Sequence, residues 1–397
     1  MSTTIATRPG RQHVVATNQR GMTLVELMVA LLLGLVTTYF IAQVFAVAEG
    51  QKRTATFGSD AQVNGAVALH TLKRHLQNSG YGITSAYEGL GCTIRGEYGT
   101  AGNTTAVPAM TLAPALITPS ATASAPSDSV TILASNKSDF AVPSRITAKT
   151  EPASGQRYMR VNNSAGAKVG DVMMTVPQVR DANHPCTLFT VAEDNSSPTA
   201  TLSREYIPML AAAASSFNHA PDTVWPPGGI VEGDWVVNLG QTMRRMVFGV
   251  GGDNFQVTTW TQLGIGTTEQ LQSGVVLLKA LYGHDTDGDR IVDTYDTNTP
   301  ADTAGWRNVL AVRVVIVARS GQRERDIVTT AEPTWNVGAN VDVNYVGVPG
   351  SAATSCVASA SNCAVTLPLS HLNDWQYYRY KVFDTVVPLR NLIWNLG

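Results

Sequence analysis

Five aspartates occur within twelve residues near the middle of the C-terminal half of this 397-residue sequence. They are Asp285, Asp287, Asp289, Asp293 and Asp296. Counted from Asp285, they take positions 1, 3, 5, 9 and 12 of a twelve-residue calcium loop, and the carbonyl of Ile291 takes position 7. Five carboxylates beside one arginine, Arg290, repel one another unless a cation lies among them. The spacing therefore predicts a Ca²⁺ site.

Two positions of this acidic run differ from an EF-hand loop. Arg290 stands at position 6, where glycine is usual, and Asp296 stands at position 12, where glutamate gives bidentate reach. The run also follows an apolar segment with strand composition, and not a helix. The alternative interpretation is a solvated acidic turn between two strands. His284 precedes the run, but imidazole is not a ligand that Ca²⁺ uses.

Glu26 is the only charged residue in an apolar run of 27 residues, Met22 to Ala48. About 20 such residues suffice to cross a bilayer as a helix. A carboxylate inside this run needs a partner, because its desolvation is costly. The preceding segment carries Arg8, Arg11 and Arg20 and no acid, which places residues 1–21 in the cytoplasm and exports the residues after Ala48.

Cleavage between Gly21 and Met22 would leave the apolar helix on the mature protein. It would also create an α-ammonium group four residues before Glu26. That amine is a natural counter-charge, on the same chain or on a neighbouring one. A secretory signal peptide is cleaved after its apolar core and has a shorter core. The remaining alternative is an ordinary signal anchor with an acid near one end.

The segment Gly21–Glu26 and the apolar run after it resemble the class III signal of type IV prepilins and of type II secretion pseudopilins. The resemblance implies that prepilin peptidase cleaves after Gly21 and methylates the amine of Met22. It also implies that Glu26 sets the register of the subunit in the filament. Met22 stands where phenylalanine is commonest, which favours a minor subunit over the bulk subunit.

The exported part contains all four cysteines, Cys92, Cys186, Cys356 and Cys363. Oxidation is expected there, and an even number fits two disulfides with three possible pairings. The pairing of Cys356 with Cys363 and of Cys92 with Cys186 is favoured, because the first pair is local. A spacing of six residues without an adjacent histidine is poor for zinc.

The elements that position these residues begin with a helix. No proline occurs between Pro9 and Pro108, so we expect one helix over residues 22–80, transmembrane for residues 22–48 and ended by Gly80 and Gly82. After it, residues 81–397 should form a β-rich head. β-branched and aromatic enrichment predicts strands over Ser129–Ala134, Lys168–Val176, Cys186–Val191, Gly229–Leu239, Met243–Val250, Phe255–Trp260, Gly274–Tyr282 and Val309–Ala318. Residues 101–128 and 347–362 read as surface loops.

Further residues of the head resemble the minor pilin family called PilW. They are Tyr282-Gly283, the Asp run, Trp306–Val309 and Thr385–Asn391. The resemblance covers residue 22 onward and much of residues 270–397, and it is weakest over residues 84–260. It implies an α+β, type IV pilin-like fold in which a long N-terminal helix packs on a large head.

The charge and the motifs exclude several functions. With 28 basic and 30 acidic residues, a net charge of -2 and no basic stripe, the sequence does not predict nucleic-acid binding. It contains no His-Glu-x-x-His, no Gly-x-Ser-x-Gly and no phosphate-binding Gly-Lys-Ser/Thr motif. We therefore expect a protein that is not an enzyme and that has no cofactor other than Ca²⁺.

The functional hypothesis that follows is a minor pilin that assembles or primes a type IV pilus. The resemblance implies a tip complex with other minor pilins and an adhesin, contact with the major pilin, and processing by prepilin peptidase. The chain would cross the inner membrane of a Gram-negative bacterium once, among its lipids, with the head in the periplasm, before it joins a surface pilus. The alternatives are a minor pseudopilin of a type II secretion system and a membrane-anchored, calcium-dependent adhesion module.

Overall fold

The computed structural model describes residues 21–120, 122–138, 142–164, 166–211, 214–260, 266–338, 342–345, 354–356 and 363–395, without the side chains of residues 51, 53–58, 342–345 and 354–356. The chain forms two compact units, residues 1–56 and residues 57–397, and each is described by itself. The head therefore forms one unit. Residues 1–20 of the predicted leader, residues 1–21, and most of the predicted loop 347–362 lie outside the described residues.

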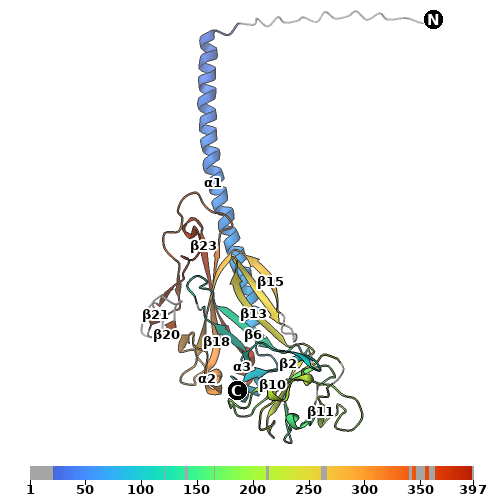
Figure 1. Cartoon of the computed structure of the whole chain (residues 1–397). Coiled ribbons are helices and arrows are strands. Elements are labelled where there is room, and N and C mark those ends of the chain that lie inside the picture. Colours follow the sequence, from blue (N-terminus) through green and yellow to red (C-terminus); the bar gives the residue numbers. More distant parts are fainter. Residues whose placement is uncertain are drawn as a thin grey trace, which may run out of the picture. The chain divides into compact units, whose positions relative to one another are not determined.

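Helix α1 runs from Leu24 to Gln77 (Figure 1) and confirms the predicted long N-terminal helix. Its part from Phe57 onward belongs to the head unit. The predicted end is confirmed within three residues: Gly80 has φ +74°, a conformation that glycine adopts without strain and that stops helices. The backbone N–H of Gly80 donates to the carbonyl of Leu133 at 2.9 Å, so the chain leaves the helix directly onto a strand.

The first sheet of the head is antiparallel and has the strand order β15-β14-β13-β6-β5. Its strands are β15 (Gly266–Ser273), β14 (Asn254–Trp260), β13 (Arg244–Gly251), β6 (Ser129–Ala134) and β5 (Ala115–Thr118). The predictions for β6, β13 and β14 are confirmed. Strand β5 lies in the segment 101–128, for which the sequence predicts a surface loop. That prediction was wrong because the alternate side chains of this Ala/Thr-rich segment are buried on pairing with β6.

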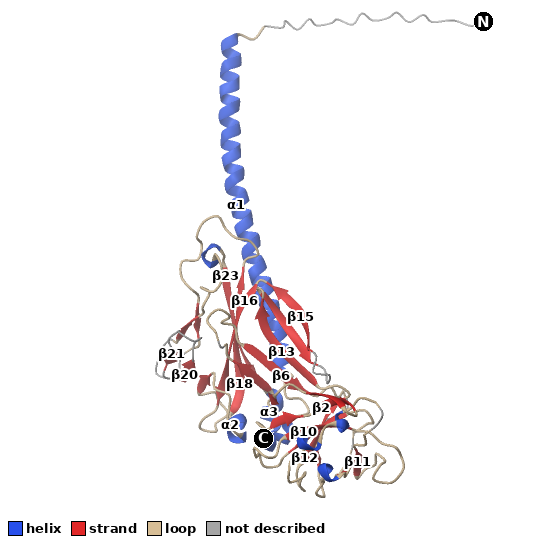
Figure 2. Cartoon of the chain, viewed as in Figure 1, coloured by secondary structure: helices blue, strands red, loops and turns tan. Residues whose placement is uncertain are grey.

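The second sheet has the order β21-β20-β17-β16-β18-β23. Figure 2 labels β21, β20, β16, β18 and β23 of this sheet. Its strands are β21 (Thr354–Cys356), β20 (Asp342–Tyr345), β17 (Thr294–Asp296), β16 (Val275–His284), β18 (Val309–Arg319) and β23 (Tyr380–Pro388). Strands β16 and β18 confirm the two predicted apolar strands. Alternate residues of β18 enter two different hydrophobic cores, so both faces of this strand are dry, as its composition predicts.

The third sheet has the order β4-β1-β10-β9-β12-β7. Its strands are β4 (Met110–Thr111), β1 (Thr93–Arg95), β10 (Cys186–Thr190), β9 (Val172–Val176), β12 (Trp235–Gly240) and β7 (Ser144–Arg145). Three predicted strands are confirmed here, with later starts for β9 and β12 than the sequence indicated. Two-stranded pairs join β2 (Glu97–Thr100) to β3 (Asn103–Ala106), β8 (Tyr158–Arg160) to β11 (Tyr206–Pro208), and β19 (Thr334–Asn336) to β22 (Ala364–Thr366).

Short helices complete the head. They are α2 (Thr303–Arg307), α3 (Arg390–Asn395), η1 (Thr84–Gly89), η2 (Pro152–Ser154), η3 (Phe217–His219), η4 (Asp222–Val224) and η5 (Trp375–Tyr377). The described elements are therefore one long helix and a head made mainly of strands, which is the predicted α+β class.

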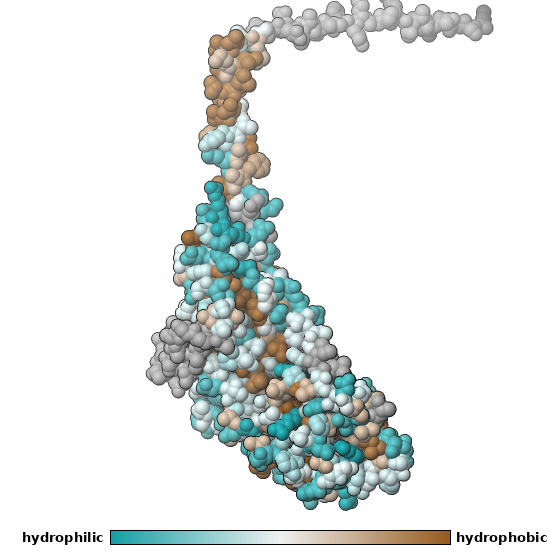
Figure 3. All heavy atoms as spheres, viewed as in Figure 1, coloured by the Kyte–Doolittle hydropathy of each residue, from teal (hydrophilic) through white to brown (hydrophobic). Residues whose placement is uncertain are grey.

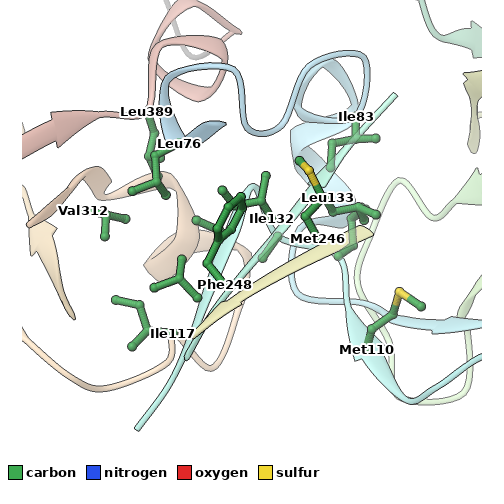
Figure 4. Packing of buried hydrophobic residues seen from close by; sticks show 14 of the residues in the cluster. Leu76, Ile83, Met110, Ile117, Ile132, Leu133, Met246, Phe248, Val312 and Leu389 are labelled. Carbon is green, nitrogen blue, oxygen red and sulfur yellow. The ribbon is translucent and has the colours of Figure 1, made fainter. Parts of the chain in front are cut away.

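The main core joins the head part of α1 to all three sheets. Leu72 and Leu76 of α1 are fully buried in one cluster with Ile132 of β6, Phe248 of β13 and Val312 of β18. Figure 4 shows Leu76, Ile132, Phe248 and Val312 facing one another across this cluster. The predicted amphipathic half of the helix is therefore the element that covers the sheets.

The disulfide between Cys92 and Cys186 is present, with its Cα atoms 5.8 Å apart. It confirms one of the two favoured pairs and joins β10 to the residue before β1, inside the main core. Cys363 is buried and also disulfide-bonded. The side chain of Cys356 lies outside the described residues, so its pairing with Cys363 stays a prediction.

Candidate functional site

The start of α1 contains Gly21, Met22 and Glu26. Gly21, Met22 and Thr23 precede the helix and are exposed. The hydroxyl of Thr23 accepts a hydrogen bond from the backbone N–H of Glu26 at 3.3 Å, and the carbonyl of Thr23 accepts one from Leu27 at 3.1 Å. Thr23 is thus the N-cap of α1, and Thr-Leu-Val-Glu has the sequence of a capping box. This cap was not predicted, although the Thr-x-x-Glu spacing carries its signal.

Glu26 lies in the first turn of α1. The unpaired N–H groups there carry partial positive charge, which favours an anion. No described residue forms an ion pair with Glu26. The helix end therefore supplies only part of the compensation that a carboxylate in apolar surroundings requires.

The helix after Glu26 presents apolar side chains on all sides. None of the residues from Leu24 to Gly50 is buried, and Leu24, Leu35 and Phe45 are 75%, 71% and 70% exposed. Figure 3 shows this apolar surface along the N-terminal part of α1. By length and composition this segment is able to cross a membrane. Lipid or other apolar helices must cover it, because water is an unfavourable solvent for such a surface.

The acidic run lies between β16, which ends at His284, and β17, which starts at Thr294. Side-chain oxygens of Asp285, Asp287 and Asp289 lie within 4.8 Å of one another. Asp285 is 7% exposed, and the other two are exposed. These three carboxylates are able to attract one metal ion, and oxygen ligands of this kind suit Ca²⁺.

Hydrogen bonds inside the loop hold its backbone. Asp285 accepts from the N–H groups of Gly288 at 2.6 Å and Arg290 at 2.9 Å, and Asp289 accepts from Ile291 at 2.7 Å. Arg290 has φ +69°, a left-handed conformation at the loop position where an EF-hand has glycine. Position 6 of the loop therefore has the left-handed backbone conformation of an EF-hand loop, although its residue is arginine and not glycine.

The other two aspartates are engaged elsewhere. Asp293 accepts hydrogen bonds from the backbone N–H of Thr286 at 2.7 Å and from its hydroxyl at 2.9 Å, and these bonds lower the pKa of Asp293. Asp296 lies 3.2 Å from Nε2 of His284 and accepts from the N–H of Asn298 at 2.9 Å. The structure thus brings three of the five aspartates together. A calcium set that also includes Asp293, Asp296 and the carbonyl of Ile291 stays a prediction.

Two family models match the sequence. Residues 243–391 match the type IV pilus-assembly protein W family, PilW, and residues 16–38 match the prokaryotic N-terminal methylation motif. The first match starts one residue before β13 and extends into α3, so it includes the acidic loop. The second includes Gly21, Met22 and Glu26. No curated protein and no solved structure matches the chain.

Proposed function

We propose that the chain, a PilW-type pilin, acts as a minor pilin in the assembly and priming of a type IV pilus. One observation carries this proposal: a prepilin-type methylation motif stands at the start of an apolar, uncovered helix on the same chain as the PilW match. The helix would enter the bundle of helices in a filament, which would cover its apolar surface. We assign the protein a structural and not a catalytic role.

The proposal includes processing by prepilin peptidase between Gly21 and Met22 and methylation of the new amino terminus. The ammonium group of Met22 is then the full positive charge that Glu26 lacks within the described residues. Before assembly the head would lie in the periplasm of a Gram-negative bacterium, with residues 22–48 in the inner membrane. After assembly the chain would be part of a surface pilus.

Mass spectrometry of the mature amino terminus tests the processing step. We expect a methylated Met22 and a loss of about two kilodaltons relative to the full translation product. Gly21→Leu should abolish this shift, whereas the matched change Gly34→Leu, inside the helix, should leave it intact. A full-length amino terminus on chains from living cells contradicts the proposal.

The role of Glu26 is tested by Glu26→Gln, which removes the charge and retains the shape. We expect normal membrane insertion and a loss of pili or of partner recovery, because the ammonium group has no counter-charge. Glu49→Gln makes the same chemical change farther along α1, beyond the apolar run, and should leave pilus formation unchanged. Equal piliation by the two variants would refute the pairing role.

The proposed partners are other minor pilins in a tip complex with an adhesin, the major pilin, and prepilin peptidase. A minor pseudopilin of a type II secretion system is the alternative that the same methylation motif supports. Cross-linked partners identified from intact cells separate the two, because pilus subunits would be recovered in one case and secretion-system subunits in the other. Sheared pili that contain no trace of the chain would contradict the pilus role.

Calcium binding at the acidic loop is a separate part of the proposal, supported by the convergence of Asp285, Asp287 and Asp289. Calcium binding is compatible both with a membrane-anchored adhesion module and with a pilin. A ligand at about one hundred times its Kd stabilises the folded state by about 2.7 kcal/mol. For a head of this size that corresponds to about 4 °C in Tm.

A chelator titration tests the calcium proposal on the full chain in detergent. We expect a chelator to lower Tm by about 4 °C and Ca²⁺ to restore it. Asp289→Asn should remove this response. Asp326→Asn is the matched control, because Asp326 is also exposed but lies outside the loop. A melting temperature that is the same with Ca²⁺ and with chelator would contradict the site.

A further inference from the structure

A pocket of about 370 Å³ lies at the C-terminal end of α1. Arg74, His75 and Asn78 line it from the end of the helix, Arg244 lines it from β13, and Lys137 lines it from the segment after β6. Ile132 and Met246, both labelled in Figure 4, supply apolar lining. This pocket lies apart from the acidic loop and shares no lining residue with it.

The charged residues that line this pocket are basic. Three cations line it, and none of the described residues that line it is acidic. Lys137 is buried and lies 2.7 Å from the carboxylate of Asp171, so its charge is compensated. Arg74 and Arg244 are exposed, and neither forms an ion pair with a described residue. Two arginines therefore line the pocket without an ion-pair partner among the described residues, although like charges repel each other.

The imidazole of His75 responds to the same charges. Its ring packs on Phe248 with the ring centroids 5.1 Å apart. Burial lowers the pKa of His75, and the charges of Arg244 and Arg74 lower it further. Lys137 and Tyr81 are the other titratable groups of the pocket. An anion placed among these groups would reverse the effect of the arginines and favour a proton on His75.

We propose that this pocket binds the carboxylate or phosphate group of a small anionic ligand, held by the guanidinium groups of Arg74 and Arg244. Guanidinium is planar and offers paired donors that match both groups. A volume of about 370 Å³ is that of a small-molecule site and excludes a large ligand from full burial. The inference is independent of the role in pilus assembly.

Calorimetric titration of the full chain in detergent tests the pocket. The probes are inorganic phosphate and glucuronate, each used alone, which separates a phosphate source from a carboxylate source. We expect saturable binding of at least one probe, and we expect Arg74→Gln and Arg244→Gln each to weaken it by about tenfold or more. Arg325→Gln changes an exposed arginine elsewhere on the head and should leave binding unchanged.

A pH series adds a readout that a merely structural role would not change. Glucuronate remains ionised between about pH 7.5 and pH 5.5, so tighter binding at the lower pH reports the proton on His75. His75→Gln should remove this dependence. The proposal is overturned if neither probe binds saturably at millimolar concentration, or if Arg325→Gln weakens binding as much as the pocket variants do.

Discussion

A buried ion pair joins the first two sheets of the head, and its removal gives the most quantitative prediction. Nζ of Lys279, on β16, lies 2.7 Å from Oδ1 of Asp128, and the two side chains are 2% and 1% exposed. The backbone N–H groups of Ser120 and Ala280 also donate to Asp128, at 3.1 and 3.2 Å. Lys279→Met retains a long apolar stem and leaves the Asp128 carboxylate buried without a cation.

The magnitude follows from this geometry. Removal of one partner of a fully buried pair costs about 3–5 kcal/mol, because an uncompensated charge remains. The unfolding entropy of a head of this size is about 0.7 kcal/mol/K, so Tm should fall by about 4–7 °C. The double change Asp128→Asn with Lys279→Met removes both charges and should recover most of the loss.

Differential scanning fluorimetry of the full chain in detergent measures these shifts. Lys149→Met is the matched control, because Lys149 lies 2.6 Å from Glu151 in a pair that is 54% and 48% exposed. Such a pair is worth about 0–1 kcal/mol, which is at most about 1–2 °C here. Equal shifts for Lys279→Met and Lys149→Met would refute the argument that burial decides the cost.

The pH dependence of Lys279→Met provides a second check. Burial raises the pKa of Asp128, and the charge of Lys279 opposes that rise. Lys279→Met removes the positive charge that opposes the rise, so the folded-state pKa of Asp128 lies further above its unfolded value. A carboxyl group of this kind stabilises the fold at low pH and loses that contribution as the pH rises through the folded pKa. The difference in Tm between wild type and Lys279→Met should therefore become smaller as the pH is lowered. The difference in Tm between wild type and the double variant should not.

Three further predictions concern other contacts of the head. Replacing Cys92 and Cys186 with serine opens a loop with a sequence separation of 94 residues. It should lower the free energy of unfolding by about 2–5 kcal/mol, seen as a lower Tm than that of oxidised wild type. Burial lowers the folded pKa of His75 below its unfolded value of 6.5, so the free energy of unfolding should fall as the pH drops below about 6.5. His75→Gln should make this fall with pH less steep. Part of the fall should remain, because burial also lowers the pKa of His371. At Gly65 an added Cβ would overlap the ring of Phe383. Gly65→Ala should therefore lower the free energy of unfolding by up to about 2 kcal/mol, although alanine has the better helix propensity. Phe383→Leu should restore this loss, and a higher stability of Gly65→Ala alone would contradict the contact.

Strong local patterns were enough to predict part of this fold. The apolar run and the absence of proline identify α1, and the continuous apolar stretches of β16 and β18 identify the central strands. Such segments are recognisable because their own residues determine their burial. The Asp spacing likewise located the acidic loop, although it did not show that Asp293 and Asp296 bond to Thr286 and His284 instead.

Other elements depend on distant partners and carry little local signal. Strand β15 is almost entirely polar and exposed, and it forms because β14 offers a free edge. Strand β5 is short and lies in a Ser/Thr/Ala-rich segment, and β23, with half-buried alternating residues, is held by β18 and α1. The basic pocket combines residues 74, 137 and 244, so only the fold brings its charges together.

The PilW match and the physical core of the head do not have the same boundaries. The match begins at residue 243, yet β13 pairs with β6, and Lys279 is buried against Asp128. The hydroxyl of Tyr282 accepts a hydrogen bond from the N–H of Ile117 at 2.6 Å. Residues of β5 and β6 are therefore required to satisfy buried groups inside the matched segment, although they lie outside it.

The third sheet has one face in the main core, where Met174, Leu188 and Val237 are buried, and its other face in a second core. Phe189, Trp225 and Val236 belong to a core of their own, whose buried residues all lie between residues 146 and 236. Changes on the surface over this core leave the buried charges and strand pairs of the matched segment untouched. Because a family model recognises positions that the shared core constrains, the region around this separate core is where contacts particular to this chain should be sought, and alanine substitutions there should alter partner recovery without a change in Tm.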